Sequence, residues 1–123
     1  MFIQPCFISK NTSELRAKLE AMGRKNYGNP FQCTDDSKMF VTIDGYYVPY
    51  NVTDIDNSFI DCGTNEELFL ALAALRDDSY RYQFITDGDE FIQISNIGSL
   101  ALPFIEDGFH KATPAELIEY FKR

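Results

Sequence analysis

Cys62 and His110 are the residues in this sequence whose types could support nucleophilic catalysis. Cys62 stands two residues before an expected helix start, where the helix dipole favours a thiolate. His110, the only histidine, precedes another expected helix, so the two side chains would approach if both helices begin at one edge of a sheet. Two first-turn glutamates, Glu66 and Glu67, oppose a thiolate at Cys62. We therefore predict a poorly reactive structural thiol and no catalytic residue, with a Cys62–His110 dyad as the alternative.

Acidic residues are numerous, but their spacing does not predict a metal site. The run DIDNSFIDCGTNE at 54–66 resembles a calcium loop in composition. An EF-hand needs glycine at its sixth position, where this chain has Phe59. Asp87 and Asp89 flank Gly88 in an expected hairpin turn, where such residues are ordinary. We expect no metal and no cofactor, since the sequence also lacks glycine-rich phosphate-binding and nucleophile-elbow motifs.

Three tyrosines, Tyr46, Tyr47 and Tyr50, form the candidate binding surface. They lie in the run GYYVPY, which follows an Asp-Gly turn signal and is rich in β-forming residues. Side chains alternate between the two faces of a strand, so either Tyr46 or Tyr47 should face solvent. Exposed tyrosines bury much area on binding at a small entropic cost. The alternative is a sheet face packed beneath a helix.

The overall charge restricts the classes of partner. The chain has 123 residues, with 19 acidic against 11 basic side chains, a formal net charge of −8 and a pI near 4.5. This balance argues against non-specific binding of nucleic acid or anionic lipid, because phosphate binding requires a basic surface. Five basic residues cluster early in the chain and are expected on a solvated helix face. They are Lys10, Arg16, Lys18, Arg24 and Lys25.

The cysteine pattern indicates reduced thiols. Cys6, Cys33 and Cys62 are odd in number, and no two have the spacing of a C-x-x-C pair. This pattern argues against a disulfide scaffold or a zinc finger and favours a reducing, cytoplasmic setting. The N-terminal run MFIQPCFISK has neither a basic leader nor a long apolar stretch. We therefore expect no signal peptide and no contact with a membrane.

Three capping patterns predict helix starts, each with a polar cap followed three residues later by glutamate. The expected pairs are Asn11 with Glu14, Thr64 with Glu67, and Thr113 with Glu116. Gly23 is the expected end of the first helix. The second helix is apolar on every side over 68–75, which predicts a core helix with Leu72 buried. The third helix is expected over 114–122.

Between the helices, the pattern predicts β-hairpins and an α+β fold. Asp-Gly turns stand between β-rich runs at 39–50 and 82–94, and a further strand is expected at 100–106. We expect a single domain with a largely antiparallel sheet and three helices packed mainly on one face. Residues 1–50 and 57–95 share the order strand, helix, hairpin. The two similar halves indicate either an internal duplication or chance similarity between amphipathic segments.

The runs DCGTNEELFLALAALRDD and KATPAELIEYFKR resemble a group of short, uncharacterised proteins of gut bacteria and their phages. Proteins of that group share a C-G-T-N-x-E-L-F helix and a terminal K-A-T-x-x-E-L-I-E-x-F helix. The resemblance covers mainly residues 60–86 and 111–123 and brings no catalytic residues with it. It implies a small accessory protein of a phage or mobile element.

The expected function is that of a small, acidic, non-enzymatic binding protein. It would act as an accessory or anti-defence factor through stoichiometric binding of a host protein. Two alternatives stay open: a sponge for a small nucleotide or metabolite, and a small cysteine-dependent enzyme. A ligand-induced melting shift would favour the sponge, and a reactive thiol would favour the enzyme.

Overall fold

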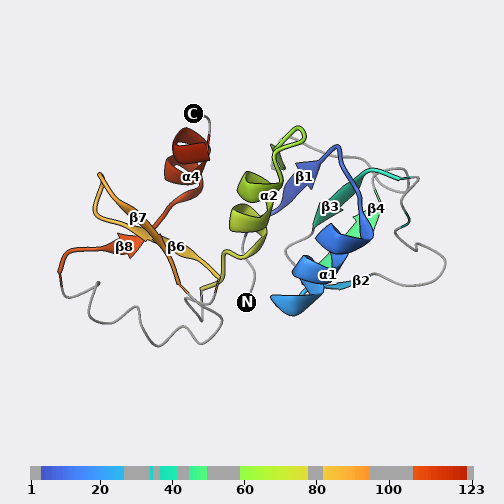
Figure 1. The fold of residues 1–123 in the computed structure, drawn as a ribbon, viewed down its shortest axis with the longest axis horizontal. Helices are drawn as coiled ribbons and strands as arrows, with labels where there is room; N and C mark the ends of the chain where they lie inside the picture. The colour runs from blue at the N-terminus through green and yellow to red at the C-terminus, as the bar shows by residue number, and fades with distance from the viewer. Residues whose placement is uncertain are drawn as a thin grey trace.

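The fold is given by a computed structural model, whose described parts combine helices and strands (Figure 1). The described residues are 4–26, 34, 37–41, 45–49, 59–77, 82–94 and 107–121. The helices are α1 (Ser13–Ala21), α2 (Glu66–Ala73) and α4 (Pro114–Phe121). The strands are β1 (Cys6–Ile8), β2 (Lys25–Asn26), β3 (Met39–Val41), β4 (Tyr46–Pro49), β5 (Ile60–Asp61), β6 (Phe84–Thr86), β7 (Phe91–Gln93) and β8 (His110–Lys111). The strand expected at 100–106 lies outside the described residues.

The described strands form two sheets. The larger has the order β2-β4-β3-β1-β5, and the smaller has the order β7-β6-β8. Every pair in the smaller sheet is antiparallel. The larger sheet is mixed, because β1 pairs parallel with β5 and β2 pairs parallel with β4. The predicted α+β class is confirmed, while the division into two sheets was not predicted, since periodicity marks strands without naming their partners.

Helix α2 is the central helix of the structure. In Figure 1 it lies between the larger sheet with α1 and the smaller sheet with α4. It packs against β1, α1 and α4. The side chains of Leu68, Leu72 and Leu75 are buried, and Leu72 is fully enclosed. The prediction of a core helix over 68–75 is confirmed, although the helix itself ends at Ala73.

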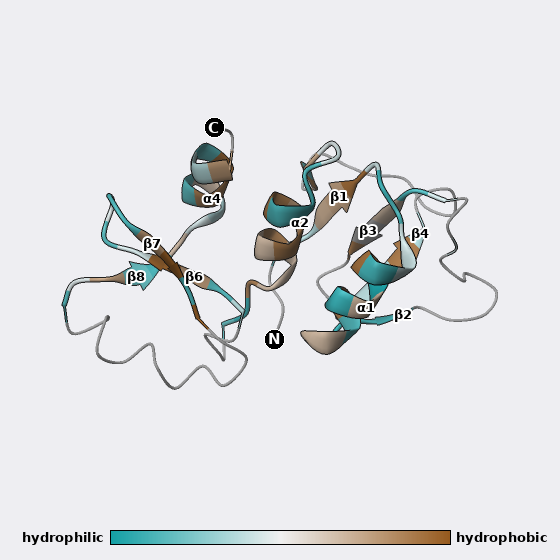
Figure 2. Cartoon of the chain, viewed as in Figure 1, coloured by the Kyte–Doolittle hydropathy of each residue, from teal (hydrophilic) through white to brown (hydrophobic). Residues whose placement is uncertain are grey.

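The elements around α2 differ in how hydrophobic their residues are. Figure 2 shows α1 and β8 mainly hydrophilic, and β6 and β7 mainly hydrophobic. The buried residues of α1 are Leu15 and Leu19, which share one stripe of the helix at the i, i+4 spacing. Leu117 is the buried residue of α4. All three belong to the same core cluster as Leu72, so one core joins the helices to β1.

Helix α1 begins one residue later than its capping pattern predicted. Its cap is Thr12, whose hydroxyl oxygen accepts a hydrogen bond from the Leu15 amide at 3.1 Å. The predicted cap, Asn11, is largely buried and makes other contacts. Its side-chain amide donates to the Thr34 carbonyl at 2.5 Å and to the Ser37 hydroxyl at 3.3 Å. The prediction was wrong because two adjacent residues could cap, and tertiary contacts hold the first one elsewhere.

Helix α2 also begins one residue late, with Asn65 rather than Thr64 as its cap. The Asn65 side-chain oxygen accepts from the Leu68 amide at 3.1 Å. The reason lies in the preceding turn, where Gly63 has a φ of 60° and the Asn65 amide donates to the Cys62 carbonyl at 3.0 Å. This turn places Asn65 at the extended backbone angles that a cap requires.

The capping pattern of α4 is confirmed in full. The Thr113 amide donates to the Glu116 carboxylate at 2.9 Å, and the Glu116 amide donates to the Thr113 hydroxyl oxygen at 3.2 Å. This reciprocal arrangement is a capping box. Partial burial raises the pKa of Glu116, but the bond from Thr113 and the nearby His110 outweigh it, so the net shift is downward.

Replacement of Thr113 by alanine is expected to lower the free energy of unfolding by about 1 kcal/mol, because the Glu116 amide loses its partner. Urea denaturation followed by circular dichroism measures this change. Thr113→Ser is the matched control, since serine retains the hydroxyl oxygen and should stay close to the parent. An unchanged midpoint for Thr113→Ala would show that the cap does not stabilise α4.

The early basic cluster does not lie on one solvated face. Gly23 ends α1 as predicted, with a φ of 110°, and its amide donates to the Glu20 carbonyl at 3.1 Å. The Arg24 amide donates to the Leu19 carbonyl at 2.9 Å, and the Arg24 side chain then turns inward to only 1% exposure. Its Nε and one Nη donate to the Ala73 carbonyl at 3.3 and 3.1 Å. The prediction of a solvated side chain is therefore wrong for Arg24, because that side chain satisfies the last turn of α2.

The two halves share their order of elements but pair their strands differently. In the first half, β1 pairs with β3 of the hairpin that follows it. In the second half, the corresponding strand, β5, pairs with β1 and not with the β6–β7 hairpin. Both hairpin turns contain glycine at positive φ, 89° at Gly45 and 107° at Gly88. In the second turn, the Asp87 carboxylate accepts from the Glu90 and Asp89 amides, and these bonds lower the pKa of Asp87. The internal duplication stays a prediction.

Candidate binding groove

Four aromatic side chains gather where α4 meets α2 and the β6–β7 hairpin. Phe91 stacks on Tyr120 with ring centroids 4.2 Å apart and planes inclined by 19°. Phe121 packs edge-on against Phe84 at 5.4 Å and against Tyr120 at 4.9 Å. All four side chains are half-buried, so each ring shows some of its surface to solvent. We call Phe84, Phe91, Tyr120 and Phe121 the aromatic cluster.

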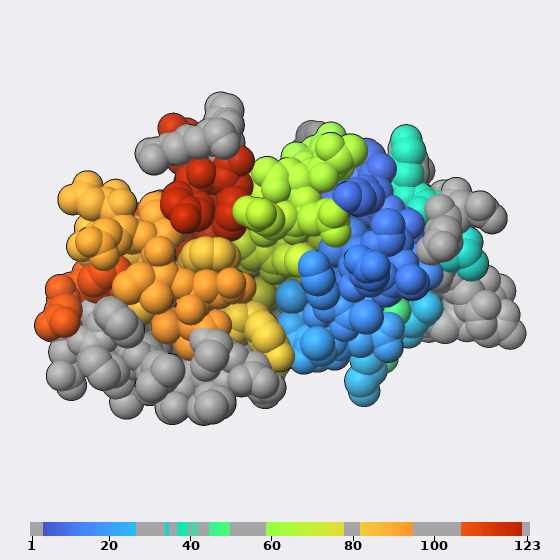
Figure 3. All heavy atoms as spheres, viewed as in Figure 1, coloured from blue at the N-terminus to red at the C-terminus, as the bar shows by residue number. Residues whose placement is uncertain are grey.

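Hydrogen bonds at both ends of α4 position the aromatic cluster. Before α4 begins, β8 pairs with β6, and the Ala112 amide donates to the Phe84 carbonyl at 2.9 Å. At the other end, the Asn65 side-chain amide donates to the Phe121 carbonyl at 3.3 Å. Asn65 therefore caps α2 and holds the end of α4 against it. Figure 3 shows α4 in contact with both α2 and residues 82–94 on this face of the molecule.

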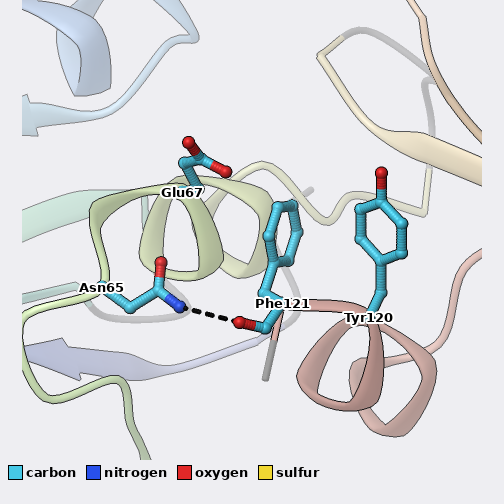
Figure 4. A pocket seen from close by; sticks show the side chains of 4 residues that line it. All are labelled: Asn65, Glu67, Tyr120 and Phe121. Atoms are coloured by element: carbon cyan, nitrogen blue, oxygen red, sulfur yellow. Dashed lines mark hydrogen bonds between the residues drawn. The ribbon is translucent and has the colours of Figure 1, made fainter. Parts of the chain in front are cut away.

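Two adjoining hollows open beside the aromatic cluster. The larger has a volume of about 500 Å³ and is lined by Asn65, Glu67, Tyr120 and Phe121 (Figure 4). The smaller has a volume of about 300 Å³ and is lined by Glu67, Leu70, Ala71, Phe84, Gln93 and Phe121. Glu67 and Phe121 line both hollows, so the two lie side by side. We call the two hollows together the α2–α4 groove.

Glu67 supplies the charge of the α2–α4 groove. Within the described part of the chain, its carboxylate has no ion-pair or hydrogen-bond partner. The neighbouring Glu66 differs, because it pairs with Lys10 at 2.5 Å and lines neither hollow. The polar atoms of Asn65 already bond to Leu68 and Phe121. The groove thus presents aromatic surface and one acidic group.

Cys62 and His110 are not brought together. Cys62 follows β5 in the larger sheet, and its amide donates to the Phe7 carbonyl at 2.8 Å. His110 lies on β8 of the smaller sheet, where its Nε2 is 3.0 Å from both carboxylate oxygens of Glu116. Figure 1 shows β8 on one side of α2 and β1, the parallel partner of β5, on the other. Since each residue has other partners in a separate sheet, the geometry offers no Cys62–His110 dyad.

Cys62 lies instead beside a second buried thiol, Cys6. In the parallel pairing of β1 with β5, Cys6 is opposite Ile60, so Cys6 and Cys62 project to the same side of the sheet. The Cys6 Sγ lies 3.8 Å from the Phe69 carbonyl of α2. Burial raises the pKa of the Cys6 thiol well above its usual value, and the hydrogen bond with Cys62 raises it further, while the weaker effect of Arg24 opposes both. Cys6 is therefore a neutral thiol at neutral pH.

Both thiols are expected to resist alkylation in the native protein, because the side chains of Cys6 and Cys62 are 0% and 6% exposed. Labelling at pH 7.5 should be slower than in the urea-unfolded chain by about a hundredfold or more, because it requires local opening. Mass spectrometry of each cysteine peptide over time measures the rates. His110→Ala should leave both rates unchanged. Fast labelling of Cys62 below pH 8 that disappears in His110→Ala would revive the enzyme alternative.

The tyrosine surface is divided between exposed and buried side chains. Tyr46 is 38% exposed, whereas Tyr47 is 1% exposed and donates its hydroxyl to the Glu20 carboxylate at 2.8 Å. The predicted alternation along the strand is confirmed. Tyr47 was wrongly included in the binding surface, because it packs beneath α1. Tyr50 lies outside the described residues, so within the described strand only Tyr46 is presented to solvent.

Comparison with known proteins assigns no family to the chain, since no family model, curated protein or solved structure matches it. Among the described residues, no group of three or more His, Cys, Asp or Glu side chains is arranged to hold a metal ion. The described helices include none with the length and apolar character needed to cross a bilayer. The functional argument therefore rests on the α2–α4 groove itself.

Sequence analysis missed the α2–α4 groove. Its aromatic residues come from three separate places in the chain, namely 84, 91 and 120–121. Phe84 and Phe91 each precede an isoleucine in a short hairpin strand, and such apolar pairs are also common in a sheet covered on both faces. A usable signal was the adjacent pair Tyr120 and Phe121, because neighbouring residues on one helix cannot both point into a narrow apolar stripe.

Proposed function

We propose that this protein is a non-enzymatic binding protein that docks one partner protein in the α2–α4 groove. The observation that carries the proposal is the half-buried aromatic cluster along a groove with an acidic residue. Aromatic side chains in preformed pockets are typical centres of protein interfaces, because they bury a large area with few rotatable bonds. The resemblance noted above supports an accessory factor of a phage or mobile element acting in the cytoplasm on a host protein.

A protein partner suits the charge of the chain better than a nucleic acid does. The net charge is −8, and the described residues that line the two hollows include no lysine or arginine. Nucleic-acid binding requires basic side chains to neutralise phosphates. An acidic surface with exposed rings instead favours a basic surface on another protein, both through steering and through contact.

Site-specific photo-crosslinking tests the proposal. A photoreactive phenylalanine analogue at position 120 is expected to yield one dominant protein adduct in cells of the source organism. The same analogue at position 46 is the matched control, because Tyr46 is an exposed tyrosine in the other sheet. The position-120 adduct should disappear when Phe84→Asp disrupts the groove, provided that the variant retains the parent's circular dichroism spectrum.

Equal adducts from positions 46 and 120 would contradict the proposed docking site, because binding would then not depend on the groove. Survival of the position-120 adduct in a folded Phe84→Asp variant would also contradict it. Mass spectrometry of the adduct identifies the partner and its stoichiometry. One partner molecule per chain is expected for stoichiometric inhibition.

A second candidate function is a sponge for a small nucleotide or metabolite. The larger hollow, at about 500 Å³, is of a size that holds small molecules, and the stacked Phe91–Tyr120 pair resembles a base-stacking platform. A panel of nucleotides and aromatic metabolites in a thermal-shift assay separates the two functions. A rise in melting temperature with one compound, abolished by Tyr120→Leu, would favour the sponge over protein docking.

A further inference from the structure

The larger hollow has the chemistry of a site for a cation. Two of the side chains that line it are aromatic, Tyr120 and Phe121, and a third is the carboxylate of Glu67. Ring faces carry negative electrostatic potential and attract ammonium and guanidinium groups. The hollow also lies at the C-terminal end of α4, where the helix dipole is negative. In Figure 4, Glu67 lies on α2 across from the two rings.

Two adjacent glutamates differ in their partners among the described residues. Glu66 and Glu67 both lie in the first turn of α2, where they complement its dipole equally. Glu66 already has a cation, Lys10. Among the described residues, none supplies a cation to Glu67. A ligand that brings one positive charge would therefore complete the hollow.

We propose that the larger hollow of the α2–α4 groove receives an arginine side chain of the partner protein. This inference rests on the proposed protein-binding function and names the chemistry that the groove recognises. A planar guanidinium can stack on the ring of Tyr120 or Phe121 while it donates two hydrogen bonds to the Glu67 carboxylate. A lysine ammonium fits less well, because it is compact, strongly hydrated and cannot stack. Asn65 forms a wall of the hollow, where its side-chain oxygen accepts from the Leu68 amide and its nitrogen donates to the Phe121 carbonyl.

The test uses short peptides and the whole protein. Acetyl-Gly-Arg-Gly-amide is titrated into ¹⁵N-labelled protein, alongside the same peptide with citrulline, which has nearly the same shape and no charge. The arginine peptide is expected to shift the side-chain amide signals of Asn65 and the backbone signals of Glu67 and Phe121. The citrulline peptide should bind at least about tenfold more weakly, because it lacks the charge that the rings and the carboxylate recognise.

Two matched variants isolate the carboxylate. Glu67→Gln is expected to weaken arginine-peptide binding by about tenfold, whereas Glu66→Gln should change it by no more than about twofold. Both variants remove one charge from the same helical turn, so they have equal effects on the net charge and on the dipole. Equal losses for the two variants would overturn the inference, because binding would then follow overall charge. Equal shifts from the arginine and citrulline peptides, or no shift at the groove, would overturn it as well.

A competing occupant could come from the same chain, since two basic residues, Lys122 and Arg123, follow the last described residue. Arg123→Gln should leave peptide affinity unchanged if a partner supplies the arginine. A gain of about tenfold or more in this variant would show that the chain fills its own hollow, which overturns the inference. Failure of the inference is distinguishable from failure of the proposed function. The position-120 crosslink would persist if a partner docks in the groove without an arginine, and it would vanish if no partner docks there.

Discussion

Replacement of Leu72 by alanine is expected to lower the free energy of unfolding by about 2–5 kcal/mol. Leu72 is fully buried at the centre of α2, the helix that contacts α1, β1 and α4. It belongs to one core cluster with residues of α1, β1 and α4, and close-packed surroundings relax only partly into the space that a missing side chain leaves. Urea denaturation monitored by far-ultraviolet circular dichroism and by tyrosine fluorescence gives the change.

Leu70→Ala is the matched control, because Leu70 lies on the same helix and removes the same atoms. Leu70 is half-buried at the α2–α4 groove, so its loss should cost less than about 1.5 kcal/mol. The two probes should report one transition for each variant if α2 joins both sheets in a single cooperative unit. A cost below about 1 kcal/mol for Leu72→Ala, or two separate transitions, would contradict the role of α2 as the shared core.

Several features that depend on nearby residues were predictable from the sequence, although the caps of α1 and α2 are each one residue later than expected. The capping box of Thr113 with Glu116 needs only two side chains and the intervening backbone, and it forms as the pattern indicates. The buried Leu72 follows from a run that is apolar all round, because such a helix must be covered. Gly23 ends α1 because the backbone after the helix adopts a positive φ, which glycine takes up without steric strain.

Features that depend on which element lies beside which were not predictable. Asn11 and Thr12 are both good caps, and the choice between them depended on a loop contact of Asn11 with Thr34. The α2–α4 groove arises from the packing of α4 on α2 through Asn65 and Phe121, which are 56 positions apart in the chain. Local sequence patterns predict which face of a helix or strand is apolar. The α2–α4 groove, in contrast, depends on which helices and strands pack against each other.

The buried arginine gives the second large expected effect. Replacement of Arg24 by alanine should lower the free energy of unfolding by about 3–5 kcal/mol. Two costs add: the Ala73 carbonyl at the end of α2 loses both guanidinium donors, and the enclosed aliphatic part of the side chain leaves a cavity. Burial lowers the pKa of Arg24 to about 10, so the side chain is still charged at pH 7 and interacts with the helix C-terminus.

Arg24→Met separates the two costs, because methionine fills much of the same space without donating hydrogen bonds. Its expected cost is about 1–3 kcal/mol, the price of leaving a buried carbonyl without those donors. Arg24→Lys should be intermediate, since an ammonium can reach the carbonyl but lacks the two-donor fork. A methionine variant as stable as the parent would contradict this account. It would show that the desolvation of Arg24, visible in its lowered pKa, cancels its hydrogen bonds to α2. Arg24 would then position the C-terminal end of α2 without contributing net stability.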